Sequence, residues 1–111
     1  MSVKYSVHIT RLAYGQLKEI RRYIAEELSS PVSARNLLQE IRASISSLQT
    51  MPSRHQLVEE EPWHTEGIRR LIVKNFYVYY WVNKAAKQVH IIAVVYGRRD
   101  QTQSLENIDV E

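Results

Sequence analysis

The stretch that decides the fold is GIRRLIVKNFYVYYWVNKAAKQVHIIAVVYG, residues 67–97. It contains three runs rich in aromatic and β-branched residues, which are typical of strands. These runs are residues 67–74, 76–83 and 88–97. The connections between them, at residues 74–75 and 83–87, are short enough for β-hairpins. The stretch therefore predicts three consecutive strands joined by tight turns.

The residues before this stretch predict one strand and two helices. Residues 3–10 alternate between apolar and polar side chains, as in a half-buried strand. Apolar residues then recur at helical spacing from about Arg11 to about Leu28, and again from Leu37 to Leu48. Ser30 fits an N-cap, and Pro31 fits the first position of the second helix. Two helices joined by so short a link are expected to form an antiparallel hairpin.

The expected fold is therefore α+β, in the order β-α-α-β-β-β. The sheet is expected to be rich in antiparallel pairs, with the N-terminal helix hairpin packed on one face. Residues 51–66 show no period and are predicted to form a loop. We expect one domain over residues 1–100 and a polar tail over residues 101–111.

Composition narrows the possible classes of function. The chain of 111 residues has no cysteine, and its four histidines show no metal-ligand spacing. We therefore expect neither a metal site nor a cofactor. Apolar runs are too short to cross a bilayer, and the first residues do not resemble a signal peptide. These observations predict a cytoplasmic protein with no membrane partner.

Positive charge is concentrated in one segment of the chain. Residues 67–99 hold seven basic residues and no acidic ones, whereas residues 1–66 hold eight of each kind. Residues 100–111 hold four acidic residues and no basic ones. Such segregation is typical of a surface that meets phosphates or an acidic partner. The alternative is a solvated sheet edge, which lysines protect against aggregation.

Strand parity predicts which side chains leave the core. The set with Val78 and Val82 is the better candidate for packing on the helices, whereas the last strand is apolar on both faces and its parity stays open. The residues left for the opposite face are Arg70, Lys74, Tyr77, Tyr79 and Trp81, together with Arg99 if the last strand continues regularly.

Two interpretations of this face stay open at this point. Arginines beside flat aromatic rings suit single-stranded nucleic acid, because guanidinium groups bind phosphates and rings stack on bases. Alternatively, Tyr79 and Trp81 form a minor core that the tail or a partner covers.

The order of elements resembles the RelE/ParE superfamily of bacterial and archaeal toxins. KNFYVYYWVN and VVYGRRD resemble its last two strands, and RRYIAEELSSPVSARNLLQEI resembles its helix hairpin. The resemblance covers roughly residues 3–100. It implies a toxin of a type II toxin–antitoxin module that a cognate antitoxin holds inactive. RelE-like members cut mRNA on the ribosome as metal-independent endoribonucleases, whereas ParE-like members poison DNA gyrase.

The resemblance implies that Arg70 and Arg99 act at a phosphate, and strand parity adds the other candidates of the outer face. The catalytic candidates are Arg70, Arg99 and Tyr77, and the candidates for binding nucleic acid or another target are Arg69, Lys74, Arg98, Tyr79 and Trp81. Two positions depart from the active RelE-like pattern, because Tyr77 stands where arginine is usual and Leu105 where some members have tyrosine. The concentration of basic and aromatic residues favours ribosome-dependent mRNA cleavage, and the two departures leave gyrase poisoning and a non-toxic binding module of the same fold as alternatives.

Overall fold

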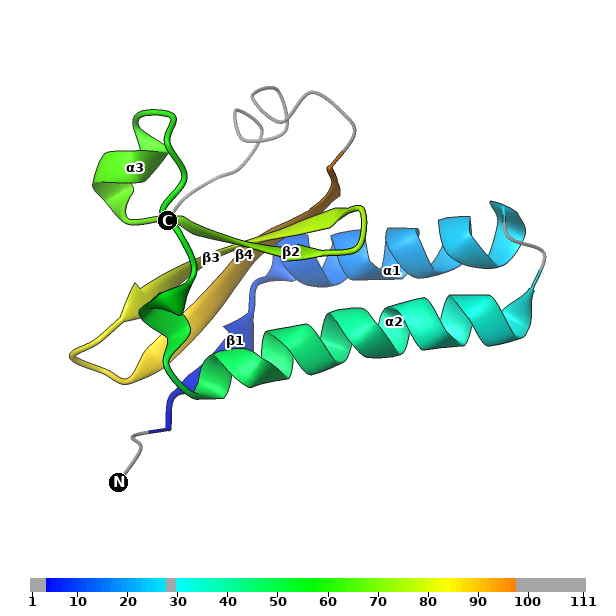
Figure 1. Ribbon diagram of the computed structural model, residues 1–111, viewed down its shortest axis with the longest axis horizontal. Coiled ribbons are helices and arrows are strands. Elements are labelled where there is room, and N and C mark those ends of the chain that lie inside the picture. The colour runs from blue at the N-terminus through cyan, green and yellow to red at the C-terminus, as the bar shows by residue number, and fades with distance from the viewer. Residues whose placement is uncertain (1–3, 28–29, 98–111) are drawn as a thin grey trace.

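The computed structural model of the chain describes residues 4–27 and 30–97. The elements in chain order are β1 (Ser6–Ile9), α1 (Arg11–Glu27), α2 (Pro31–Ser46), the short 3-10 helices η1 (Ser47–Gln49) and η2 (Pro52–Arg54), α3 (Trp63–Glu66), β2 (Arg69–Val73), β3 (Phe76–Asn83) and β4 (Gln88–Tyr96). The predicted α+β class is confirmed, and α3 is an addition to the predicted order. The two long helices run side by side and extend beyond the sheet (Figure 1). Arg98, Arg99 and the predicted tail lie outside the described residues.

Both long helices begin at residues whose side chains satisfy free backbone N–H groups. The Thr10 hydroxyl accepts a hydrogen bond from the Ala13 N–H at 3.2 Å, at the start of α1. At the start of α2, the Ser30 hydroxyl accepts one from the Ser33 N–H at 3.3 Å, and Pro31 follows as the first helical residue. The predicted cap of the second helix is thus confirmed.

The four strands form one mixed sheet in the order β1-β4-β3-β2. β1 pairs parallel with β4, and the other two pairs are antiparallel. β4 therefore lies in the interior of the sheet, which explains why its sequence is apolar on both faces. The predicted strand over residues 3–10 was too long, because the pairing with β4 covers Ser6–Ile9 alone. Val3 lies outside the described residues.

A β-bulge decides the parity of β4, which the sequence left open. Tyr79 pairs with Ala93 and Tyr80 pairs with Ile91, so Ile92 is an extra residue in β4. The side chains of β4 therefore do not alternate regularly between the two faces of the sheet over the whole strand. Ile91 and Val94 both face the helices, whereas Ile92 and Ala93 both join a cluster on the other face. The Thr10 hydroxyl donates a hydrogen bond to the Ile92 carbonyl oxygen at 3.2 Å.

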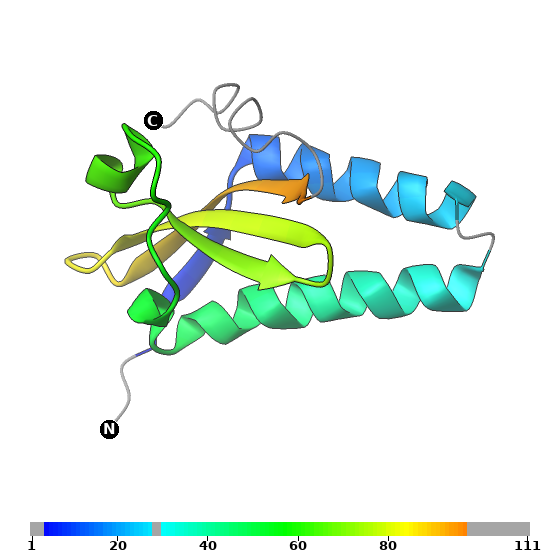
Figure 2. The same cartoon turned by 45° about the horizontal axis from the view of Figure 1, so that its top comes forward.

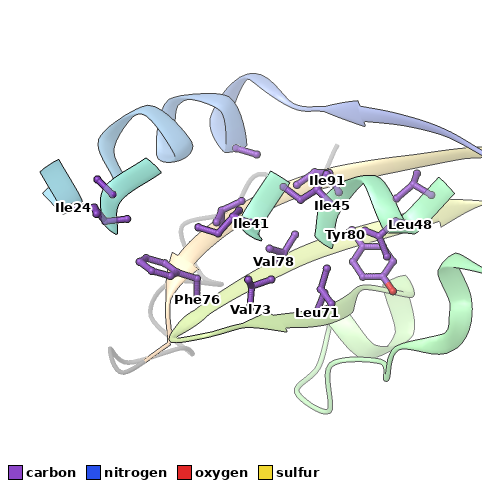
Figure 3. Packing of buried hydrophobic residues seen from close by; sticks show 14 residues of the cluster. Ile24, Ile41, Ile45, Leu48, Leu71, Val73, Phe76, Val78, Tyr80 and Ile91 are labelled. Atoms are coloured by element: carbon purple, nitrogen blue, oxygen red, sulfur yellow. The ribbon is translucent and has the colours of Figure 1, made fainter. Parts of the chain in front are cut away.

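The main core lies between the helix hairpin and the sheet. Apolar residues from α1 and α2 pack there against alternate residues of β2, β3 and β4 (Figure 3). Its fully buried members include Ala13, Ile41, Leu48, Val78, Tyr80, Val89 and Ile91. The predicted inward set of β3 is confirmed by Phe76, Val78 and Tyr80, and the predicted inward residues of β2 are Leu71 and Val73.

A smaller core covers part of the opposite face of the sheet, which we call the outer face. The segment 58–68 folds back over the strands and carries α3, as Figure 2 shows from a second side. Val58, Trp63 and Ile68 of this segment pack against Tyr79, which has no exposed surface. The loop predicted over residues 51–66 contains two short helices, η2 and α3, and the remaining residues form turns and irregular connections. The expected minor core is confirmed for Tyr79 alone, because Trp81 is 38% exposed and lies outside the cluster. Its cover is this segment, where the sequence had suggested the tail or a partner.

Replacing Tyr80 by phenylalanine is expected to lower the free energy of unfolding by about 1–3 kcal/mol. The buried Tyr80 hydroxyl donates a hydrogen bond to the Pro52 carbonyl oxygen at 2.6 Å, and its loss leaves that oxygen without its partner. Urea unfolding of both proteins measures the difference. An unchanged free energy of unfolding would show that this bond does not hold η2 on the sheet.

Candidate functional site on the outer face of the sheet

Arg70 of β2 and Tyr77 of β3 meet on the outer face. Both residues have the strand parity opposite to the core residues Leu71 and Val78, so their side chains leave the helix side. The Arg70 guanidinium carbon lies 4.7 Å from the centroid of the Tyr77 ring. At this distance the cation is attracted to the face of the ring. The pair combines a permanent positive charge with a phenol hydroxyl.

The Tyr77 ring lies directly against the backbone at the end of β4. A Cβ atom added to Gly97 would stand only 2.7 Å from Cε1 of Tyr77. The Gly97 N–H also donates a hydrogen bond to the Asn75 carbonyl oxygen at 2.6 Å. Glycine is therefore required at position 97, because any side chain would collide with the Tyr77 ring in its position beside Arg70.

Tyr79 lies beneath this pair and is closed to a ligand. Its hydroxyl oxygen is buried, and Arg70 is the charged side chain that interacts with it. Burial raises the pKa of Tyr79, although the nearby positive charge of Arg70 acts in the opposite direction. Tyr79 forms an edge-on contact with the Tyr77 ring, with centroids 6.4 Å apart. The ring supports Tyr77 from below and presents no face on which a base could stack.

Two of the predicted binding residues point away from the outer face. Arg69 pairs with Tyr80 and donates a hydrogen bond from Nη1 to the His55 carbonyl oxygen at 2.6 Å. Lys74 sits in the turn after β2 with a positive φ of 55°, and its Nζ lies 3.7 Å from Oε2 of Glu40 in α2. The predicted outward direction of Lys74 was wrong, because the left-handed turn redirects its side chain toward the helices.

Trp81 takes part in a ladder of stacked rings that was not predicted from the sequence. Its ring centroid is 5.6 Å from that of His90, which is 5.5 Å from that of His8. The three residues come from β3, β4 and β1, which are neighbours in the sheet. The alternation in residues 3–10 placed His8 on the polar face, but the register that joins it to His90 is not visible from the sequence. Trp81 is 38% exposed.

Acidification is expected to destabilise the protein in part through His90. Burial and the neighbouring His8 lower the pKa of His90 below its ordinary value of 6.5. The unfolded chain therefore binds a proton more readily than the folded one, so stability falls as the pH falls below about 6.5. Thermal unfolding between about pH 8 and about pH 5 tests this, because His90→Gln should reduce the loss of stability.

Protonation of His55 also destabilises the folded protein, because burial and the charges of Arg54 and Arg69 lower the pKa of His55. His55→Gln is therefore a matched variant that should remove its own share of the pH dependence. Identical pH profiles for the parent protein and the His90 variant would contradict the assignment to the ring ladder.

The predicted site is thus assembled only in part among the described residues. Arg70 and Tyr77 come together, Trp81 is exposed on the same face, and Arg98 and Arg99 lie outside the described residues. The pair can hold an anionic group by charge and by a hydrogen bond from the phenol. No group of three or more metal-ligating side chains occurs within the described ranges.

Two of the solved structures that share this fold come from toxin–antitoxin assemblies. One is a chain of the chromosomal ParDE toxin–antitoxin system from P. aeruginosa, with a TM-score of 0.68, 23% identity, and coverage of 86% of this chain and 98% of that one. The other belongs to the toxin–antitoxin complex RelBE2 from Mycobacterium tuberculosis, with a TM-score of 0.63, 18% identity, and coverage of 85% and 92%. The architecture is therefore the one found in RelE/ParE toxins.

The sequence itself identifies the family. Residues 7–101 match the family described as the ParE toxin of the type II toxin–antitoxin system, parDE, and the chain belongs to it. No curated protein sequence matches the chain. None of the helices in the described part of the chain is long and apolar enough to cross a membrane.

Proposed function

We propose that this toxin acts on DNA gyrase as a protein target and that a cognate antitoxin holds it inactive. The proposal rests on the ParE family, whose members resemble this chain over residues 7–101. The proteins of similar fold come from toxin–antitoxin assemblies, which supports an antitoxin partner.

One observation favours gyrase over RNA cleavage, namely the dispersal of Arg69, Lys74 and Arg70 within the described part of the chain. Cleavage of RNA by the adjacent 2′-hydroxyl needs several cations and a proton-transfer group gathered around one phosphate. The structure places Arg69 against the His55 carbonyl and Lys74 beside Glu40, on the side of the helices. Arg70 is left beside Tyr77, and a phenol does not replace a permanent charge.

A supercoiling assay with purified toxin and gyrase tests this proposal. We expect the toxin to inhibit supercoiling and to leave gyrase-linked linear DNA after detergent and protease treatment. A toxin that stops growth in cells but leaves purified gyrase fully active would contradict the proposal.

The second candidate is ribosome-dependent mRNA cleavage, which the pair of Arg70 and Tyr77 supports. In this scheme Arg70 and Arg99 stabilise negative charge on the phosphate, and the Tyr77 hydroxyl donates a hydrogen bond to it. Arg70→Ala and Arg99→Ala should then abolish toxicity while antitoxin binding survives. Primer extension on a defined mRNA in cell-free translation should show ribosome-dependent cuts, and intact mRNA would remove this candidate.

Expression of the toxin alone tests whether it is toxic at all. Growth arrest that is relieved by co-expression of the antitoxin is the expected result. Harmless expression of a folded protein would instead favour the non-toxic binding module.

A further inference from the structure

Three basic residues outside the pair of Arg70 and Tyr77 gather beside the start of β2. Arg54 is the last residue of η2, His55 follows it, and Arg69 begins β2. Nη1 of Arg69 donates a hydrogen bond to the His55 carbonyl oxygen at 2.6 Å. Nε of Arg54 donates one to Nε2 of the His55 ring at 3.4 Å. His55 therefore joins both guanidinium groups in one set of residues, which we call the basic cluster.

The charge of the basic cluster is not balanced by a carboxylate within residues 4–27 and 30–97. Neither Arg54 nor Arg69 takes part in an ion pair in these ranges. Burial and then the charges of Arg54 and Arg69 lower the pKa of His55, as expected where positive charges gather. Like charges this close repel each other, so an anion bound among them would relieve the repulsion.

Arg54 is exposed, yet neighbouring residues hold its guanidinium group in one orientation. Its Nη2 lies 3.1 Å from Oγ of Ser47 and 3.5 Å from the Ser47 carbonyl oxygen, and its Nε contacts the ring of His55. Its Nη1 makes no hydrogen bond within the described part of the chain. A guanidinium group that is already oriented loses less freedom when it binds an anion through two hydrogen bonds.

A pocket of about 320 Å³ opens beside the basic cluster, along the edge of β2. It is lined by Arg54, His55, Gln56 and Leu57 from the end of η2 and the segment after it, and by Arg70, Leu71 and Ile72 from β2. No acidic residue lines this pocket in the described ranges. Its volume lies at the lower end of the range for small-molecule sites, about 300–1,000 Å³. The pocket therefore has the size and the hydrogen-bond donors to hold a small anionic group.

We propose that the basic cluster binds a phosphate group in this pocket. The guanidinium group of Arg54 holds two phosphate oxygens, and Arg69 adds a second positive charge nearby. A peptide strand fits less well, because the edge of β2 beside the cluster is already paired. The Arg70 N–H donates a hydrogen bond to the Gln56 carbonyl oxygen at 3.1 Å, and Leu57 forms a bridge with Arg69. The proposal does not depend on the target of the toxin.

Proton NMR of the histidine rings tests the proposal on the full chain. Inorganic phosphate is added at about pH 6.5, where imidazole titrates, and is compared with chloride at the same ionic strength. We expect the His55 ring signal to shift and then to saturate, because a bound anion favours the protonated imidazole. The signals of His8, His64 and His90 should move much less, because these residues lie outside the basic cluster.

Two variants with the same change in charge locate the phosphate. Arg54→Gln removes the oriented guanidinium group and should weaken phosphate binding about tenfold. Arg35→Gln on α2 makes the same change in net charge elsewhere and should alter phosphate binding less than about twofold. Arg54 and Arg35 are both exposed, so circular dichroism should show that both variants stay folded.

Competition with the bound phosphate identifies the source of the group. A single-stranded DNA of about eight nucleotides that competes more strongly than AMP points to the backbone of a nucleic-acid strand, and the reverse order points to a free nucleotide.

Three results would overturn the proposal. The His55 signal could move equally with chloride and with phosphate, which would remove the phosphate site. The two variants could weaken phosphate binding equally, which would reduce the effect to net charge. A polyglutamate peptide could move the His55 signal where phosphate does not, which would make the basic cluster a site for acidic peptides.

Discussion

Replacing Ile41 by alanine is expected to lower the free energy of unfolding by about 2–5 kcal/mol. Ile41 has no exposed surface and stands at the middle of α2, facing the sheet near Val78 (Figure 3). The interior around it is close-packed, so removal of three carbons loses apolar burial and leaves a cavity that neighbouring side chains fill only in part. Urea unfolding followed by circular dichroism measures the change.

Val32→Ala is the matched control on the same helix. Val32 is 62% exposed, so its truncation should change the free energy of unfolding by less than about 0.5 kcal/mol. Equal effects of the two substitutions would show that the face of α2 assigned to the core is wrong.

Gly97→Ala is expected to destabilise the protein by about 1–3 kcal/mol. The new methyl group would stand 2.7 Å from Cε1 of Tyr77, well inside contact distance. Either the Tyr77 ring must move away from Arg70 and Tyr79, or the end of β4 must move away from Asn75. Thermal or urea unfolding detects the loss, and the same change in the Tyr77→Ala background should cost much less.

Gly15→Ala provides a control with the opposite sign. Gly15 lies within α1, and a Cβ added there meets no atom within 4 Å. Alanine should therefore stabilise the helix by about 0.5–1 kcal/mol, because it restricts the unfolded chain and suits a helix better. Destabilisation by Gly97→Ala that persists without the Tyr77 ring would contradict the close contact as its cause.

The periodic parts of the fold could be predicted from the sequence. The helical recurrence of apolar residues gave α1 and α2, and Ser30 with Pro31 marked where α2 begins. The alternation in residues 76–83 gave the bounds and the inward face of β3. These patterns work because burial of one face repeats every 3.6 residues in a helix and every two in a strand.

The rest depends on contacts between distant residues. The bulge at Ile92 shifts the parity of half of β4, and a strand that is apolar on both faces shows no sign of it in its sequence. The segment 58–68 has no period, yet Val58, Trp63 and Ile68 cover Tyr79. The cover forms through tertiary packing, which local pattern does not encode.

In the candidate site too, some side-chain positions could be predicted from the sequence and others could not. The parity of β2 and β3 correctly placed Arg70 and Tyr77 on one face, since both strands are regular there. Lys74 was misplaced because a left-handed turn residue does not continue the alternation of its strand. The stacking of His8 on His90 depends on the parallel register of β1 with β4, which joins residues 82 positions apart.

One coupled experiment separates an attack of the toxin on gyrase, with mRNA left intact, from cleavage of mRNA. Purified toxin is added to a bacterial transcription–translation extract that contains gyrase and a supercoiled plasmid. Plasmid topology after detergent and protease treatment is read beside mRNA 5′ ends from the same reaction. We expect toxin-dependent linear plasmid with unchanged mRNA ends. Toxin-dependent mRNA ends at ribosomal A sites, with the plasmid still supercoiled, would contradict gyrase as the target.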